Sequence, residues 1–89
     1  MTHETTTTLS GAEVLARAVK FFAERVPQSA AFPDERGPAF LTLRGQGGEE
    51  VAIAVLAAGA ATHVRASTLF FDQAVARFLN TLPAAEVVA

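Results

Sequence analysis

Two short glycine-containing turns divide residues 39–68 into three segments in which apolar and polar side chains alternate. Residues 45–48 read Gly-Gln-Gly-Gly and form the first turn, and Gly59 marks the second. Alternation with a period of two is typical of β-strands that have one buried face. Connections this short join antiparallel strands, whereas parallel strands need a long crossover. The sequence therefore predicts an antiparallel meander with strands at 39–44, 49–57 and 61–68.

An amphipathic helix is predicted before the meander. It begins at Ser10, where Glu13 completes a capping box and Leu9 with Val14 forms a hydrophobic staple. Pro27 ends it near residue 25 or 26. Its solvated face carries two pairs at the i, i+4 spacing, Glu13 with Arg17 and Lys20 with Glu24. Its apolar stripe comprises Val14, Leu15, Ala18, Val19, Phe21, Phe22 and Val26.

A second amphipathic helix is predicted over residues 69–82, with Asp72 in its first turn and Pro83 after its end. Its buried stripe comprises Phe71, Ala74, Val75, Phe78 and Leu82. The segments without a periodic pattern are predicted to be irregular: a disordered tail over 1–8, a proline-rich loop over 27–38 and a frayed tail over 84–89. The expected fold is a single α+β domain over 9–83, with both helices on one face of a three-stranded sheet.

Alternation also assigns each strand residue to one of the two sheet faces. The face that the helices are expected to cover comprises Leu41, Leu43, Val51, Ile53, Val55, Val64 and Ala66. The opposite, open face comprises Phe40, Thr42, Arg44, Ala52, Ala54, Leu56, His63, Arg65 and Ser67. Alanines and a leucine in the middle strand of an open face allow another layer to approach closely. A solvated face with scattered apolar residues is the alternative.

Composition narrows the classes of function. Seven basic residues against nine acidic ones give a net charge of −2, which argues against nucleic-acid binding through phosphate contacts. The longest apolar stretch, 51–61, is shorter than the about 20 residues that membrane insertion requires. The absence of cysteine excludes disulfides and thiol chemistry and suits a cytoplasmic protein. Only 18% of the residues are charged, against about 25% in typical domains, so part of the apolar surface is expected to be covered by a partner.

The pattern contains no catalytic or metal-binding constellation, and no cofactor is expected. His63 and Ser67 lie about 13 Å apart along a strand, too far to form a hydrolase triad with Asp72. His3 and His63 fall short of the three or four convergent ligands that zinc requires. The turn at 45–48 lacks the lysine of a phosphate-binding loop.

Two further sites stay open. Arg44, His63 and Arg65 could form a small anion-binding rim, although Phe40 is the one aromatic residue available there to stack on a nucleobase. The second open possibility is an active site that is completed across a subunit interface, and the sequence indicates no particular residue for it.

The stretch from Gly59 to Pro83, GAATHVRASTLFFDQAVARFLNTLP, resembles the close of START and Bet v 1-like helix-grip (SRPBCC) proteins. Those proteins end in a strand that runs into an amphipathic helix, and this helix lies across an antiparallel sheet and encloses an apolar ligand pocket. The resemblance covers under a third of the chain. It implies a half-size unit whose cavity forms between two copies, and it carries over no ligand-binding residue.

These observations favour a small non-enzymatic binding or assembly module that forms a homodimer through its sheet, by the open face or by an edge. The alternative is a carrier or sensor of a small apolar ligand, bound between helices and sheet or between subunits. Another protein is the remaining possible partner. The residues expected at the interface or ligand site are Phe40, Arg44, Ala52, Ala54, His63, Arg65 and Phe71. An internal ligand pocket would be lined by Phe22, Phe71, Val75 and Phe78, with Arg65 or His63 at its polar end.

Overall fold

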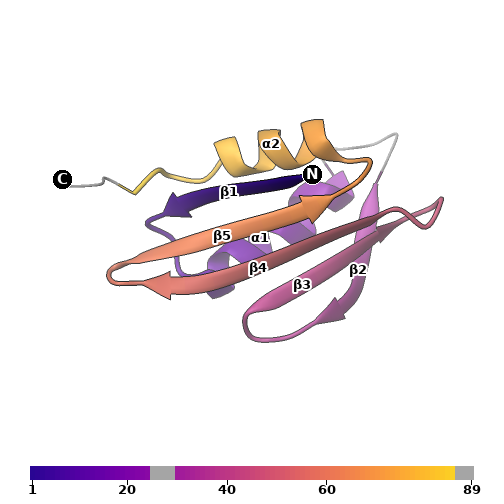
Figure 1. The fold of residues 1–89 in the computed structure, drawn as a ribbon. Helices are drawn as coiled ribbons and strands as arrows, with labels where there is room; N and C mark the ends of the chain where they lie inside the picture. Colours follow the sequence, from indigo (N-terminus) through magenta and orange to yellow (C-terminus); the bar gives the residue numbers. More distant parts are fainter. Residues whose placement is uncertain (25–29, 86–89) are drawn as a thin grey trace.

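The structure is a computed structural model that describes residues 1–24 and 30–85. It is an α+β fold in which five antiparallel strands form one sheet in the order β1-β5-β4-β3-β2. Figure 1 shows the sheet from its open side, with α1 behind it and α2 along the β1 side. The elements are β1 (Thr2–Thr7), α1 (Gly11–Glu24), β2 (Ala31–Arg36), β3 (Phe40–Gly45), β4 (Glu50–Ala58), β5 (Ala61–Thr68) and α2 (Asp72–Asn80). The predicted class is confirmed, but the prediction of three strands is wrong.

The central meander follows the prediction to within one residue at each strand end. In the β3–β4 turn the Gly45 amide donates a hydrogen bond of 2.8 Å to the carbonyl of Glu49. Gly48 and Gly59 have φ angles of 87° and 65°, a region that residues with a Cβ rarely adopt. Glycine is therefore required at one position in each turn, and these glycines are the reason that both turns could be predicted from the sequence.

Residues 1–8 do not form the disordered tail that the sequence predicts. Thr2–Thr7 form an edge strand that pairs with β5 over six residue pairs, from Thr2 opposite Ser67 to Thr7 opposite Thr62. The C-terminal segment joins it, because Ala84 bridges Thr7. The predicted frayed tail is thus wrong for Ala84, and residues 86–89 lie outside the described residues. Threonine favours strands, but a run of threonines shows no apolar alternation.

The loop predicted over 27–38 contains a strand. Ala31–Arg36 form β2, which pairs with β3 along the other edge of the sheet. The pairing slips between Pro33 and Glu35, and the Thr42 hydroxyl accepts a 3.0 Å hydrogen bond from the Glu35 amide there. Proline is tolerated on an edge strand because its missing N–H is not needed by a further neighbour. Residues 27–29 lie outside the described residues.

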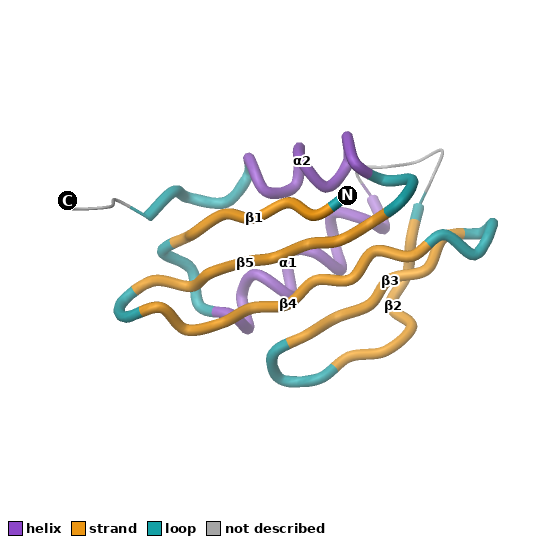
Figure 2. Tube along the Cα trace, viewed as in Figure 1, coloured by secondary structure: helices purple, strands orange, loops and turns teal. Residues whose placement is uncertain are grey.

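Both helices cover the same face of the sheet and share one hydrophobic core, as predicted. α1 packs against β2, β3 and β4, and α2 packs against β1 and β5. Figure 2 shows α1 on the far side of the sheet and α2 beside β1. The phenylalanine rings of α1 and α2 meet in the middle: the centroid of Phe78 lies 5.4 Å from that of Phe21 and 5.8 Å from that of Phe22. The predicted aliphatic face is confirmed: Leu41, Leu43, Val51, Ile53, Val64 and Ala66 are buried, and Val55 is partly buried against the core.

The helix starts differ in how well they were predicted. The Ser10 hydroxyl accepts a 3.2 Å hydrogen bond from the Glu13 amide, which confirms the predicted cap. The Glu13 carboxylate pairs with Arg17 at 3.1 Å, also as predicted. α2 starts at Asp72 and not at residue 69. The Thr68 hydroxyl accepts a hydrogen bond from the Phe71 amide, and this bond closes a turn before the helix. The predicted end of the first helix, at 25 or 26, lies outside the described residues.

Candidate functional site

The candidate site is the open face of the sheet, the face that neither helix covers. Strand register brings its side chains into four rows that run across the sheet. The predicted residues all belong to it, except Phe71. In order along the strands, the rows are Thr6, His63 and Leu56; Glu4, Arg65, Ala54 and Phe40; Thr2, Ser67, Ala52, Thr42 and Glu35; and Glu50, Arg44 and Phe32.

The middle of the open face is small and apolar. Ala52 is half-buried and Ala54 is exposed, both on β4, the central strand. Three larger apolar side chains surround them and project into solvent, with exposed fractions of 42% for Phe40, 69% for Leu56 and 53% for Phe32. The contribution of Phe32 was missed because β2 was predicted to be a loop.

The charged groups of the open face are partly paired within the subunit. Arg44 donates to Asp34 at 3.1 Å, to Glu50 at 3.2 Å and to the Gly48 carbonyl at 3.2 Å. His63 Nε2 lies 2.8 Å from Glu4 Oε1. Arg65 forms no ion pair with any residue in the described ranges.

The structure does not assemble the candidate anion-binding rim of Arg44, His63 and Arg65. His63 lies in the first of the four rows and Arg44 in the last, so the two residues are about 20 Å apart along the strand direction. Each also has an acidic partner of its own. Arg65 is therefore the one basic group of the three that an outside partner would meet unpaired.

Phe71 lies in the core and not on the open face. It is 6% exposed and immediately precedes α2, whose first residue is Asp72. The other residues expected to line an internal pocket, Phe22, Val75 and Phe78, are at most 1% exposed. Their side chains fill the space between helices and sheet, where the carrier hypothesis places a ligand.

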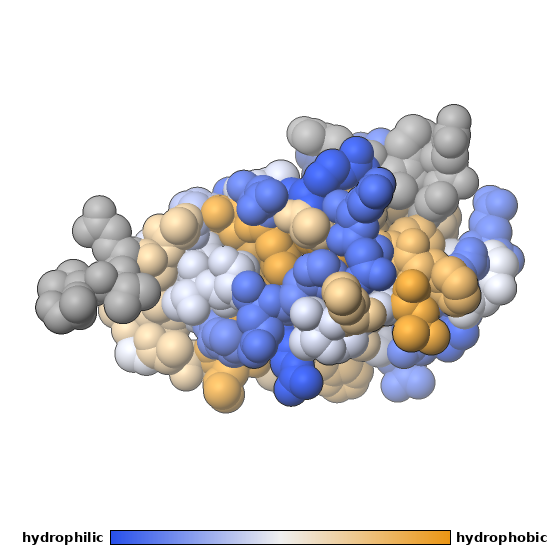
Figure 3. Space-filling view, turned by 45° about the horizontal axis from the view of Figure 1, so that its top comes forward, coloured by the Kyte–Doolittle hydropathy of each residue, from blue (hydrophilic) through white to orange (hydrophobic). Residues whose placement is uncertain are grey.

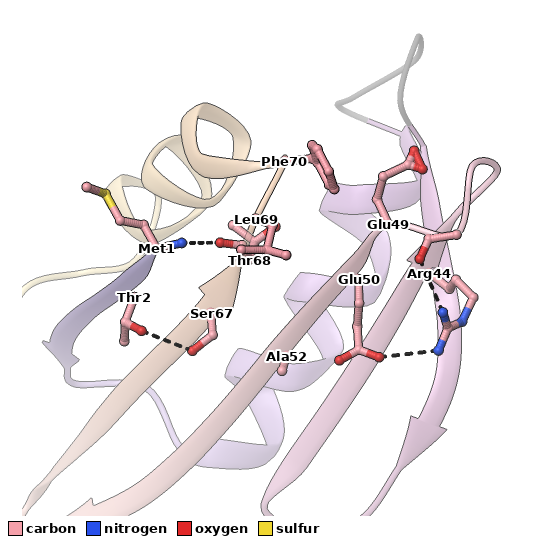
Figure 4. Close-up of a pocket in the computed structure, with 11 residues that line it drawn as sticks. Met1, Thr2, Arg44, Glu49, Glu50, Ala52, Ser67, Thr68, Leu69 and Phe70 are labelled. Atoms are coloured by element: carbon pink, nitrogen blue, oxygen red, sulfur yellow. Dashed lines mark hydrogen bonds and ion pairs between the residues drawn. The ribbon is translucent and has the colours of Figure 1, made fainter.

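A hollow of about 560 Å³ lies at the end of the open face, between the β3–β4 turn and the β5–α2 turn. Figure 4 shows Phe70 beside this space, with Arg44 and Glu50 on the opposite wall. Leu69 and Phe70 are 81% and 75% exposed, although both were predicted to be helical. Hydrophobic surface gathers at this end of the molecule, to the right in Figure 3. The lining of the hollow is mixed: Arg44, Glu49 and Glu50 are charged, and Leu69 and Phe70 are large apolar side chains.

A cluster on the β1 side was missed because residues 1–8 were predicted to be disordered. His3 Nε2 donates to Asp72 Oδ1 at 2.9 Å, and the N-terminal ammonium lies 3.6 Å from the same oxygen. The hydrogen bond from His3 lowers the pKa of Asp72 below its ordinary value of 3.8; burial opposes this shift, and the N-terminal charge adds to it. The cluster ties β1 to the start of α2.

The lowered pKa of Asp72 predicts a pH dependence of stability. A carboxylate whose pKa is lower in the folded state stabilises the fold at pH values above its ordinary pKa, and this contribution disappears as the pH falls through the folded value. We expect Asp72→Asn to be less stable than the wild type at pH 7, and this gap to close below pH 3.8. Chemical denaturation of both proteins across this range measures the gap. A gap that persists unchanged at low pH would contradict the prediction.

Within the part of the chain that it describes, the structure does not bring the residues of a hydrolase triad or a metal site together. His63 and Ser67 face the open side, whereas Asp72 binds His3 beside α2, so the three do not form a triad. Among residues 1–24 and 30–85, no three side chains of the metal-binding types come together. Over the same ranges, neither helix has the length and hydrophobicity to cross a membrane.

Comparison with known proteins adds no relative: no family model, curated protein or solved structure matches the chain.

Proposed function

We propose that this chain is a small non-enzymatic assembly module that forms a homodimer through the open face and works in the cytoplasm, where its lack of cysteine fits. The observation that carries the proposal is the apolar centre of an uncovered sheet: Ala52 and Ala54, with Phe40 and Leu56 exposed beside them. An uncovered apolar patch of this kind is typical of an interaction surface. A second copy would remove these side chains from water.

The edges of the sheet are less suited to pairing with another chain than the face is. β2 carries Pro33 and an irregular register, two features that discourage strand addition. On β1, the C-terminal segment occupies part of the outer edge: Ala85 donates to the Thr6 carbonyl at 3.1 Å and Thr8 donates to the Pro83 carbonyl at 3.3 Å. The open face has no such protection, which favours face-to-face assembly.

The open face is large enough for a stable dimer. The four rows hold fifteen side chains, and each occupies about 32 Å² at normal strand spacing, which gives a footprint of about 480 Å². Side-chain relief raises the accessible area above this footprint, towards the lower end of the about 600–1,000 Å² that each subunit contributes to a standard interface.

A carrier of a small apolar ligand is the second candidate, and the resemblance to helix-grip proteins motivates it. β5 leads into α2, and α2 packs on the sheet, which is the arrangement that the resemblance implies. The buried phenylalanines argue against a ligand between helices and sheet, so a carrier would bind between subunits. Native mass spectrometry separates the two candidates, because a carrier would retain a constant additional mass.

Ala54→Arg tests the proposed interface directly. We expect the dimer to dissociate with a dissociation constant at least about 100-fold higher, because each copy would bury an uncompensated charge at the centre of the face. Sedimentation velocity over a tenfold concentration range measures the change. Ala16→Arg is the matched control, since Ala16 is exposed on α1 and lies outside the sheet. A folded Ala54→Arg protein with the wild-type mass would overturn the proposal, as would a monomeric wild type.

A further inference from the structure

The strand order makes β4 the central strand, and this constrains how two open faces can meet. With the order β1-β5-β4-β3-β2, a two-fold axis that lies between the faces and parallel to β4 places β4 over the partner's β4. The same axis places β5 over the partner's β3 and β1 over the partner's β2. Face-to-face sheets of this kind pack about 10 Å apart with nearly aligned strands.

We infer that the two copies pack about this axis, with Arg65 of each subunit stacked on Phe40 of the partner subunit. The inference rests on the proposed function and specifies how its interface is built. Arg65, Ala54 and Phe40 are consecutive in one row on β5, β4 and β3. Rotation about the axis parallel to β4 exchanges the two ends of this row. Each Arg65 therefore lies over Phe40 of the partner subunit, and Ala54 lies over its own copy.

The chemistry of the two side chains fits this contact. Arg65 is exposed and forms no ion pair within the described part of the chain, so its guanidinium is free to bind a partner. Phe40 is 42% exposed, and its ring lies against Gly37 in the β2–β3 turn. A guanidinium over an aromatic ring is attracted by the ring quadrupole, and it loses less hydration than an ammonium would. Small alanines between the two contacts allow the sheets to approach.

The neighbouring rows are also compatible with the axis along β4. Leu56 lies over its own copy, so the most exposed aliphatic side chain of the face is buried against another leucine. Thr42 lies over Ser67 of the partner subunit, so that two polar side chains of similar size face each other. The Glu50 carboxylates approach each other, and Arg44 of each subunit, which pairs with both Asp34 at 3.1 Å and Glu50 at 3.2 Å, offsets part of their repulsion.

An in-plane axis perpendicular to the strands is less compatible with the same side chains. If that axis passes between Ala52 and Ala54, it places Leu56 over Glu50 of the partner subunit. If it passes through Ala54, it places Arg65 over Arg65 of the partner subunit, which sets two unpaired cations against each other. The axis along β4 avoids both conflicts.

Chemical crosslinking tests the orientation cleanly because the chain has no cysteine. Thr42→Cys and Ser67→Cys proteins are prepared separately, mixed, allowed to exchange subunits and treated with a bismaleimide of about 10 Å reach. The inferred axis brings these two positions to about 10 Å across the interface, against about 15 Å for the perpendicular axis between the alanines. We expect a strong crosslink in the mixture and a weak one in either protein alone.

Sedimentation measurements on Arg65→Gln, Phe40→Leu and the double variant test the contact itself. Each single variant is expected to raise the dissociation constant about tenfold or more, and the double variant is expected to add little beyond either, because both changes remove the same two contacts. Arg77→Gln, an exposed arginine on α2, is the control and should leave the constant unchanged.

The outcomes separate the two proposals. A monomeric wild type overturns the proposed function and this inference together. A dimer that Ala54→Arg disrupts, but in which the mixed Thr42→Cys and Ser67→Cys proteins do not crosslink, overturns the orientation and leaves the assembly module standing. Additive effects of Arg65→Gln and Phe40→Leu overturn the direct contact between these side chains.

Discussion

Replacing Phe22 by alanine is expected to remove about 3–5 kcal/mol from the free energy of unfolding. Phe22 is fully buried, and its ring lies 5.3 Å from that of Phe21 and 5.8 Å from that of Phe78, between the two helices. The cost combines lost apolar burial with the cavity that remains. A domain of this length is stabilised by roughly 4–13 kcal/mol, so the loss is a large part of the total. Urea denaturation, monitored by circular dichroism at one protein concentration, measures it.

The chain supplies a matched control for this substitution. Phe70 is 75% exposed in the β5–α2 turn, so Phe70→Ala removes the same atoms without opening a cavity. We expect its effect on the free energy of unfolding to stay within about 0.5 kcal/mol. Equal losses from the two variants would contradict the packing described for the helix layer.

Thr5→Pro is expected to destabilise the fold by about 3 kcal/mol, because it breaks the pairing of β1 with β5. The Thr6 carbonyl and the Thr8 amide point outwards to the C-terminal segment, and backbone directions alternate along a strand. The Thr5 amide therefore points inwards to Val64, its partner on β5. Proline at position 5 removes this donor and leaves a ladder carbonyl unsatisfied. Urea denaturation again provides the measurement.

Glu4→Pro is the control, because the backbone of Glu4 faces the outer edge, where proline is tolerated. It also removes the 2.8 Å contact between Glu4 and His63, an exposed pair that contributes little. We expect a loss below about 1 kcal/mol. If both proline variants unfold at the wild-type midpoint, residues 2–7 are a tail and the β1 assignment is wrong.

The parts of the fold that were predicted correctly all carry a local pattern in the side chains. Val51, Ile53 and Val55 alternate with Ala52 and Ala54, which identified both the strand and its buried face. The apolar spacing of the helices likewise identified the buried side chains of α1 and, except for Leu79, those of α2. Six of the seven candidate site residues lie on the open face for the same reason, because a strand that buries one face exposes the other.

Phe71, the seventh, shows where pattern alone was insufficient. The doubled phenylalanines at 70 and 71 are equivalent in composition, and the start of α2 determines which of them points inwards. The Thr68 hydroxyl bonds to the Phe71 amide, so the helix begins three residues later than its apolar pattern suggested. Phe71 is consequently buried and Phe70 is exposed.

The sequence by itself determined the meander, its two glycine turns, the faces of its strands and the buried stripes of both helices. Each of these features depends on interactions within a hairpin or a single helix. Burial of one face places apolar side chains at a regular spacing along such an element, so the feature can be recognised in the sequence. Only the tertiary structure decided that Thr2–Thr7 and Ala31–Arg36 are edge strands and that His3 meets Asp72. Edge strands are stabilised largely by backbone hydrogen bonds to a neighbour, and every residue except proline offers the same donor and acceptor. Such pairing leaves little trace in the order of the side chains.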